Sequence, residues 1–328
     1  KAERWSWAGG GANPATTVGN ANPNPALAAN FYSATRAGIV RYDADTIGVY
    51  AQDMIALTRR WKLLLGARWD HFKADYDRAL PAGDLARTDR VASYRTGLIY
   101  QPSDFASYYV AYGTSFNPSG ELYSLDDRGA NTPPEKNRNI EAGAKWELAD
   151  GNLSLRTAVF RTEKKNERNT DLDVVVTQNL LSGKRHTDGV ELEAAGRITP
   201  NWEVFSGVAL MKGEIDAATG DQANTLGKKP INTPSYTYNV WTVYRLGAGW
   251  KIGGGVEGVG HRYANTTNTV LVPRYGRVDA LLAYERPRYD IKLNVLNVFD
   301  RDYYEGVYQG HVVPGTQRTL MVTGRFKY

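Results

Sequence analysis

The chain has 328 residues, with 40 Lys and Arg against 35 Asp and Glu, and it contains no cysteine. The net charge of +5 is modest for this length and the basic residues are scattered rather than clustered, which disfavours nucleic-acid binding. Without cysteine a disulfide framework is excluded. No window approaches the roughly 18 consecutive apolar residues of a membrane helix, so any membrane crossing has to use strands.

The chain alternates between long polar loops and tight turns, beginning with an expected strand at residues 1–7. Long loops are expected at 9–38, 74–88, 117–135, 164–184, 213–234, 264–273 and 303–316. Tight turns are expected near 58–61, 101–104, 149–151, 199–201, 247–249 and 286–288. These connections separate about fourteen strands. Alternating long and short connections are typical of an all-β, transmembrane antiparallel β-barrel with its long loops outside the cell.

The expected strands carry apolar residues at every second position and polar or small residues between them. In 189–198, for example, Val190, Leu192 and Ala194 alternate with Glu191 and Glu193. A soluble antiparallel sheet can also have a charged face. Repetition over about a dozen strands instead favours a large wet interior and a lipid-facing exterior.

Aromatic residues gather near the expected tight turns, where rings can form a girdle at the membrane interface. Ordinary core filling is the alternative. The girdle is expected to comprise Tyr100, Trp146, Trp202, Trp241, Tyr244, Trp250, Tyr284 and Tyr328.

Motifs of enzymes are weak in this chain. Residues 253–258 match the dinucleotide-binding glycine spacing, but a strand end and a loop follow where that motif needs a helix. The four histidines, His71, His186, His261 and His311, are too scattered for a chelating pair, and no Gly-x-Ser-x-Gly elbow occurs. The sequence therefore predicts no catalysis, no metal site and no resident cofactor.

The C-terminal segment carries Asn-Val-Phe-Asp at 297–300, Tyr303 and Tyr304, a loop with Gly315, and an alternating strand that ends on an aromatic residue. Together with segments 45–53, 65–70, 112–118, 134–146 and 188–193, this series resembles the TonB-dependent outer-membrane receptors, nearest the catecholate-siderophore branch. The resemblance covers about residues 40–328.

The resemblance implies a bacterial outer-membrane, multi-pass receptor that takes up ferric siderophores. A TonB-type energy transducer would act on a plug domain, and the barrel-assembly machinery and outer-membrane lipid would be further partners. Because the family has a plug and roughly 22 strands, residues 1–328 are expected to be a partial barrel without the plug. A self-closed smaller barrel, in which residues 1–8 pair with the last strand, is the structural alternative. The alternative for the function is a passive, porin-like diffusion channel.

An anionic, aromatic-rich iron chelate needs basic and flat aromatic side chains at the strand tops and in the loops. Each such residue could equally be an ordinary solvated loop residue. The candidates for contact with a ferric siderophore are Phe116, Tyr123, Arg128, Lys184, Arg185, Arg262, Tyr263 and Tyr308. Phe326 and Tyr328 are expected to carry the assembly signal that resembles the family's aromatic C-terminal residue.

Overall fold

The structure, a computed structural model, describes residues 2–7, 36–77, 83–118, 133–168, 180–218, 220–308 and 311–327. Within these ranges, fourteen strands form one sheet whose order follows the chain. They are β1 (Ala2–Trp7), β2 (Arg36–Ala56), β3 (Trp61–Asp77), β4 (Leu85–Ser103), β5 (Ala106–Asn117), β6 (Glu135–Leu148), β7 (Leu153–Arg168), β8 (Leu180–Thr199), β9 (Trp202–Ala217), β10 (Tyr236–Gly247), β11 (Trp250–Val259), β14 (Tyr275–Glu285), β15 (Tyr289–Leu296) and β18 (Thr319–Phe326).

The long connections after β9 contain further elements. A 3-10 helix, η1 (Gly220–Thr225), follows β9. Two hairpins form separate two-stranded sheets, one from β12 (Arg262–Tyr263) and β13 (Leu271–Val272), the other from β16 (Tyr304–Tyr308) and β17 (His311–Pro314). No helix within the described ranges is both long and apolar enough to span a membrane.

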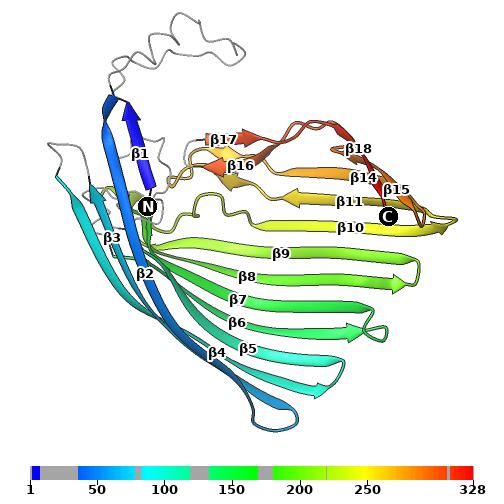
Figure 1. Cartoon of the computed structure of the whole chain (residues 1–328), viewed down its shortest axis with the longest axis horizontal. Helices are drawn as coiled ribbons and strands as arrows, with labels where there is room; N and C mark the ends of the chain where they lie inside the picture. The colour runs from blue at the N-terminus through cyan, green and yellow to red at the C-terminus, as the bar shows by residue number, and fades with distance from the viewer. Residues whose placement is uncertain are drawn as a thin grey trace, which may run out of the picture. The chain divides into compact units, whose positions relative to one another are not determined.

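The chain divides into two compact units, and β2, β3 and β4 each have residues in both. The first comprises Lys1–Val49, Trp69–Ala92 and Asn117–Pro134. Its described core is a small cluster of Tyr42, Phe72, Ala74 and Tyr76. The second unit comprises Tyr50–Arg68, Ser93–Phe116 and Glu135–Tyr328, and Figure 1 shows its strands β6 to β11 side by side.

All six predicted tight turns are confirmed, because a strand ends and the next begins at each of them. Several long loops are shorter than predicted. β3 continues to Asp77, β7 to Arg168 and β9 to Ala217, while β8 already begins at Leu180. The strand ends continue past the apolar segments because charged side chains pair across strands there. Arg138 Nη2 of β6, for example, lies 2.5 Å from Glu163 Oε1 of β7.

The antiparallel registers define two faces of the sheet in the second unit, since directly opposed residues point to the same side. One row of opposed residues is Trp146, Leu155, Ala194, Ser206, Val240, Val256 and Val278, and its side is called the apolar face. The neighbouring row is Lys145, Arg156, Glu193, Gly207, Asn239, Glu257 and Arg277, and its side is called the polar face. The predicted alternation is confirmed, with large apolar side chains such as Leu192 and Val256 exposed.

Aromatic rings line the tight-turn ends of the strands. In one series the ring centroids lie 4.7 to 6.4 Å apart, in the order Trp61, Tyr100, Tyr108 and Trp146. A second series joins Trp250, Tyr284 and Tyr289 at 4.6 and 6.3 Å. These contacts fit the predicted girdle.

The prediction that Trp241 belongs to the girdle is wrong. It stands opposite Phe205 and Gly255 on the polar face. Its ring lies across Gly255, where a Cβ atom would collide with it. The register decides the side on which Trp241 lies, and closeness to a turn does not reveal the register.

Candidate functional site: an interlocked set of loops

Three long connections of the second unit pack together, and their described residues within 218–235, 260–274 and 297–318 are called the loop platform. Hydrogen bonds join the first connection to the second. Lys228 Nζ donates to Thr267 O at 2.7 Å. Lys229 N donates to Asn268 Oδ1 at 2.9 Å, and Asn268 Nδ2 returns a bond to Lys229 O at 2.9 Å. The first two loops are therefore held together by hydrogen bonds between side chains of one loop and the backbone of the other.

An apolar cluster joins the second connection to the third. Ala264 and Val272 of the β12–β13 hairpin bury their side chains against Val307 of β16. Ile231 of the first connection packs on the same cluster. Ala264, Val272 and Val307 are at most 5% exposed, so the platform has a small core of its own.

Arg262 ties the same two hairpins together by polar contacts. Its Nη2 donates to Tyr304 O at 2.6 Å and to Glu305 O at 3.2 Å. The guanidinium also lies 5.8 Å from the centre of the Tyr275 ring. Burial lowers the pKa of Arg262 from the usual arginine value. The side chain is 5% exposed and engaged with backbone carbonyls, so its observed contacts are structural.

Arg277 anchors the platform to the polar face of the sheet. Its Nη1 donates to the Tyr303 hydroxyl at 2.9 Å, and its Nη2 lies 3.2 Å from Glu257 Oε2 and 3.1 Å from Asp279 Oδ2. The ring of Tyr303 in turn lies 4.6 Å from that of Tyr275. One arginine therefore connects the carboxylates of two strands, β11 and β14, to the third connection through Tyr303.

Asn297 forms the corner where the chain leaves β15. Its side chain is 1% exposed, donates from Nδ2 to Arg301 O and Thr316 O at 2.9 and 3.0 Å, and accepts from Arg301 N at 3.0 Å. Its φ of 49° is in the left-handed region, which asparagine tolerates better than most residues. Asp300 completes the corner by accepting from Arg318 N at 2.7 Å. The Asn-Val-Phe-Asp motif thus builds the base of the third loop, a role that the sequence interpretation did not assign to it.

The predicted contact residues Lys184 and Arg185 are neighbours on β8, and each pairs with a different carboxylate of β7. Lys184 Nζ lies 3.4 Å from Glu163 Oε2, whereas Arg185 Nη2 lies 2.5 Å from Glu167 Oε1. Both cations already have carboxylate partners, and the two do not form one site.

The other predicted contact residues are dispersed. Phe116 is half-buried near the end of β5. Tyr263 is half-buried on β12, and its carbonyl accepts from Asn232 N at 3.0 Å. Tyr308 ends β16 within the platform, so the platform brings Arg262, Tyr263 and Tyr308 into neighbouring hairpins. Tyr123, Arg128 and Tyr328 lie outside the described residues. Phe326 stands on the apolar face opposite Tyr289 and is 76% exposed.

A cavity of about 540 Å³ lies where the platform meets the sheet. Tyr236 and Tyr238, which belong to the apolar face, line one side with their rings stacked at 6.3 Å. The other lining residues are Arg274, Tyr275, Gly276, Arg301, Asp302 and Tyr303. Within the described ranges no group of three or more His, Cys, Asp or Glu side chains is placed to hold a metal ion.

Residues 3–298 match the family described as TonB dependent receptor-like, beta-barrel. The chain belongs to this family, which is one of transport receptors. The predicted family, the all-β barrel fold class and the bacterial outer-membrane location are thereby confirmed. In this setting the apolar face is the one that meets lipid.

The alignments with similar proteins extend over most of this chain. The probable TonB-dependent receptor BfrD of Bordetella pertussis is 32% identical, over 97% of this chain and 45% of its own length. The crystal structure of the siderophore receptor PiuA from Acinetobacter baumannii superposes with a TM-score of 0.77 at 29% identity, over 88% of this chain and 44% of that one. The ferric-catecholate import receptor Fiu of Escherichia coli K12, in its closed form, gives a TM-score of 0.74 at 27% identity, over 89% and 46%. This chain spans less than half the length of these relatives.

Proposed function

We propose that the protein carrying this chain imports ferric siderophores across the outer membrane. The observation that carries the proposal is the family match over residues 3–298, together with relatives named as siderophore receptors. Several of these, at 28% identity, are named catecholate siderophore receptors. The iron is cargo inside its chelator, so recognition falls to side chains that fit the chelate.

The loop platform supports this proposal physically. Binding loops need a rigid frame, and the platform obtains one from the buried Val272 cluster and from the Arg277 anchor. Its surface offers arginine and tyrosine side chains, which suit an anionic aromatic complex. Arg262 is buried and acts indirectly, by holding in place the two hairpins that carry this surface.

The partners follow from the family name. A TonB-type transducer would supply energy to a plug that gates the barrel, and the complete gene product would carry the transport activity. Recognition of Phe326 and Tyr328 by the barrel-assembly machinery stays a prediction. The relatives favour an energised receptor over a passive diffusion channel.

The test is iron uptake by the full-length gene product in a strain that lacks its own siderophore receptors. Radiolabelled iron is supplied as a catecholate, a hydroxamate or a citrate chelate, with and without a functional TonB transducer. We expect TonB-dependent uptake that is strongest for the catecholate. TonB-independent entry of small unrelated solutes at equal rates would instead identify a diffusion channel.

A further inference from the structure

A charged row follows directly on an apolar row on the apolar face of β7, β8 and β9. The apolar row is Val159, Val190 and Leu210, and the charged row is Arg161, Asp188 and Lys212. From Asp188 to the end of β8 at Thr199 the strand is about 36 Å long. At a strand tilt of about 45° this length covers about 25 Å along the membrane normal, which is the height of the apolar band of an outer-membrane barrel. Because the tight turns occupy the other end, the charged row lies at the outer-leaflet interface.

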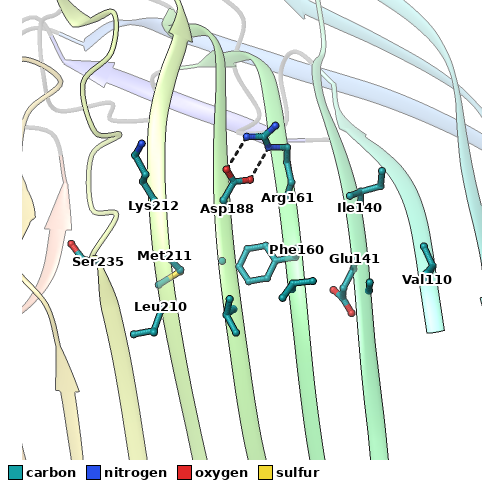
Figure 2. A pocket seen from close by; sticks show the side chains of 14 residues that line it. Val110, Ile140, Glu141, Phe160, Arg161, Asp188, Leu210, Met211, Lys212 and Ser235 are labelled. Atoms are coloured by element: carbon teal, nitrogen blue, oxygen red, sulfur yellow. Dashed lines mark hydrogen bonds and ion pairs between the residues drawn. The ribbon is translucent and has the colours of Figure 1, made fainter. Parts of the chain in front are cut away.

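A depression of about 670 Å³ spans the two rows. Figure 2 shows Arg161, Asp188 and Lys212 along one end of it, with Leu210 and Val110 farther along the strands. The small side chain of Ala142 lies beside larger apolar side chains that are more than half exposed, such as Ile140 at 56% and Val159, directly opposite, at 53%. The depression therefore has an apolar floor and a charged end.

The charged end retains binding capacity. Arg161 donates from Nε and Nη2 to the two carboxylate oxygens of Asp188, both at 2.7 Å, which uses two of its five N–H groups. Lys212 stands opposite Asp188 with a side chain that is 76% exposed. Its ion-pair partner among the described residues, Glu214, is 3.6 Å away. The row Arg161, Asp188 and Lys212 carries a net charge of +1.

Positive charge continues along the same border of the apolar face. Ser235 lines the depression, and the next residue, Tyr236, lines the cavity beneath the loop platform. Arg274 and Arg301 line that cavity and are exposed, and within the described ranges neither forms an ion pair with a carboxylate. An anionic group at this height would meet cations on both sides of β10.

We propose that the depression binds a phosphorylated glycolipid of the outer leaflet, with its phosphate at Lys212 and Arg161 and an acyl chain over Ala142. Phosphate oxygens match the remaining donors of the guanidinium and the ammonium group. The apolar floor offers a hydrocarbon chain a concave surface to pack against, which the bulk bilayer does not provide. This lipid site is separate from siderophore uptake and does not depend on it.

The proposal is tested on the full-length protein in mild detergent, with lipid A as the probe and native mass spectrometry to count bound lipid on folded molecules. Lys212→Glu should raise the apparent Kd for lipid A about tenfold or more, the effect of losing a charge-assisted hydrogen bond. Ala142→Phe should weaken binding as well, because it fills the depression and leaves every charge in place. Arg288→Glu, on the exposed turn between β14 and β15, is the matched control and should change nothing.

Three further arms separate the explanations. Lys212→Ala gives a milder change should the charge reversal impair folding, and it should weaken binding in the same direction. Dephosphorylated lipid A should bind wild type and Lys212→Glu equally and weakly. Equal binding of lipid A by wild type, Lys212→Ala and Ala142→Phe would show that lipid covers this surface without a specific site. Displacement of lipid A by millimolar inorganic phosphate would reassign the site to the free ion, and either result overturns the proposal.

Discussion

Asp279 Oδ1 accepts a hydrogen bond from the backbone N of Asn297 at 2.8 Å, so a carboxylate on the polar face of β14 holds the first residue beyond β15. The same carboxylate also pairs with Arg277. A single side chain thus links the sheet to the corner on which the third loop of the platform is built.

Asn297→Ala should therefore destabilise the folded protein by about 2–4 kcal/mol, since it removes a buried side chain that bonds the backbone groups of Arg301 and Thr316, and a residue suited to positive φ. Chemical unfolding of the full-length protein from lipid vesicles measures this change in the free energy of unfolding. Asn294→Ala, three residues earlier on the polar face, is the control and should cost about 0.5 kcal/mol or less. Equal losses from the two changes would contradict the role of Asn297.

The two faces can be tested by inserting charge. Leu192→Arg places a guanidinium on the lipid-facing side and should cost about 2–4 kcal/mol at mid-bilayer, and Ala144→Arg should behave similarly. Glu193→Arg should be mild, because Glu193 is exposed on the polar face and its pairing with Arg156 is loose, at 4.0 Å. Folding yield into vesicles measures each variant, and indistinguishable yields would refute the assignment of faces.

Arg277→Ala should loosen the loop platform more than the sheet. We expect faster hydrogen exchange and protease cleavage within 297–308, since the anchor to Tyr303 is lost. Arg245→Ala removes an arginine that pairs with Glu203 near the tight turns and should leave exchange in the platform unchanged. Identical exchange in the two variants would show that Arg277 does not anchor the platform.

Binding of a ferric catecholate should depend on loop arginines. Arg128→Ala and Arg185→Ala should each weaken binding by about 1–3 kcal/mol where the guanidinium pairs with the chelate. Arg185 must exchange its bond to Glu167 for that contact, so Glu167→Gln should strengthen binding if Arg185 touches the ligand. Fluorescence titration of the full-length protein measures all three, and an unchanged affinity for Arg185→Ala would remove it from the site.

The fold was largely predictable from sequence because alternation and turn residues are local signals. Val190 and Glu191 identify opposite faces without any tertiary information, and the turn near 149–151 is marked by its own residues. The lengths of the loops were not predictable in the same way. Beyond the apolar band a strand continues through pairs such as Arg161 with Asp188, whose partners are 27 residues apart in sequence.

The candidate site was less predictable because it depends on contacts between distant segments. Arg262 is an ordinary loop arginine until the β16–β17 hairpin, 42 residues later, covers it. Lys184 and Arg185 lie in a stretch of loop-like composition, but they belong to β8 and pair with different carboxylates of β7. The cavity that Arg274 and Arg301 share joins residues from separate connections, which no local pattern indicates.

The interlocking of the loop platform limits how such receptors can exchange parts by recombination. Val272 packs on Val307, and Lys228 bonds to Thr267, so each long connection carries half of a contact completed by another. A crossover between two related genes that falls inside 218–318 would pair halves from different parents. We therefore expect the loops beyond β9 to be exchangeable between related genes only as one block.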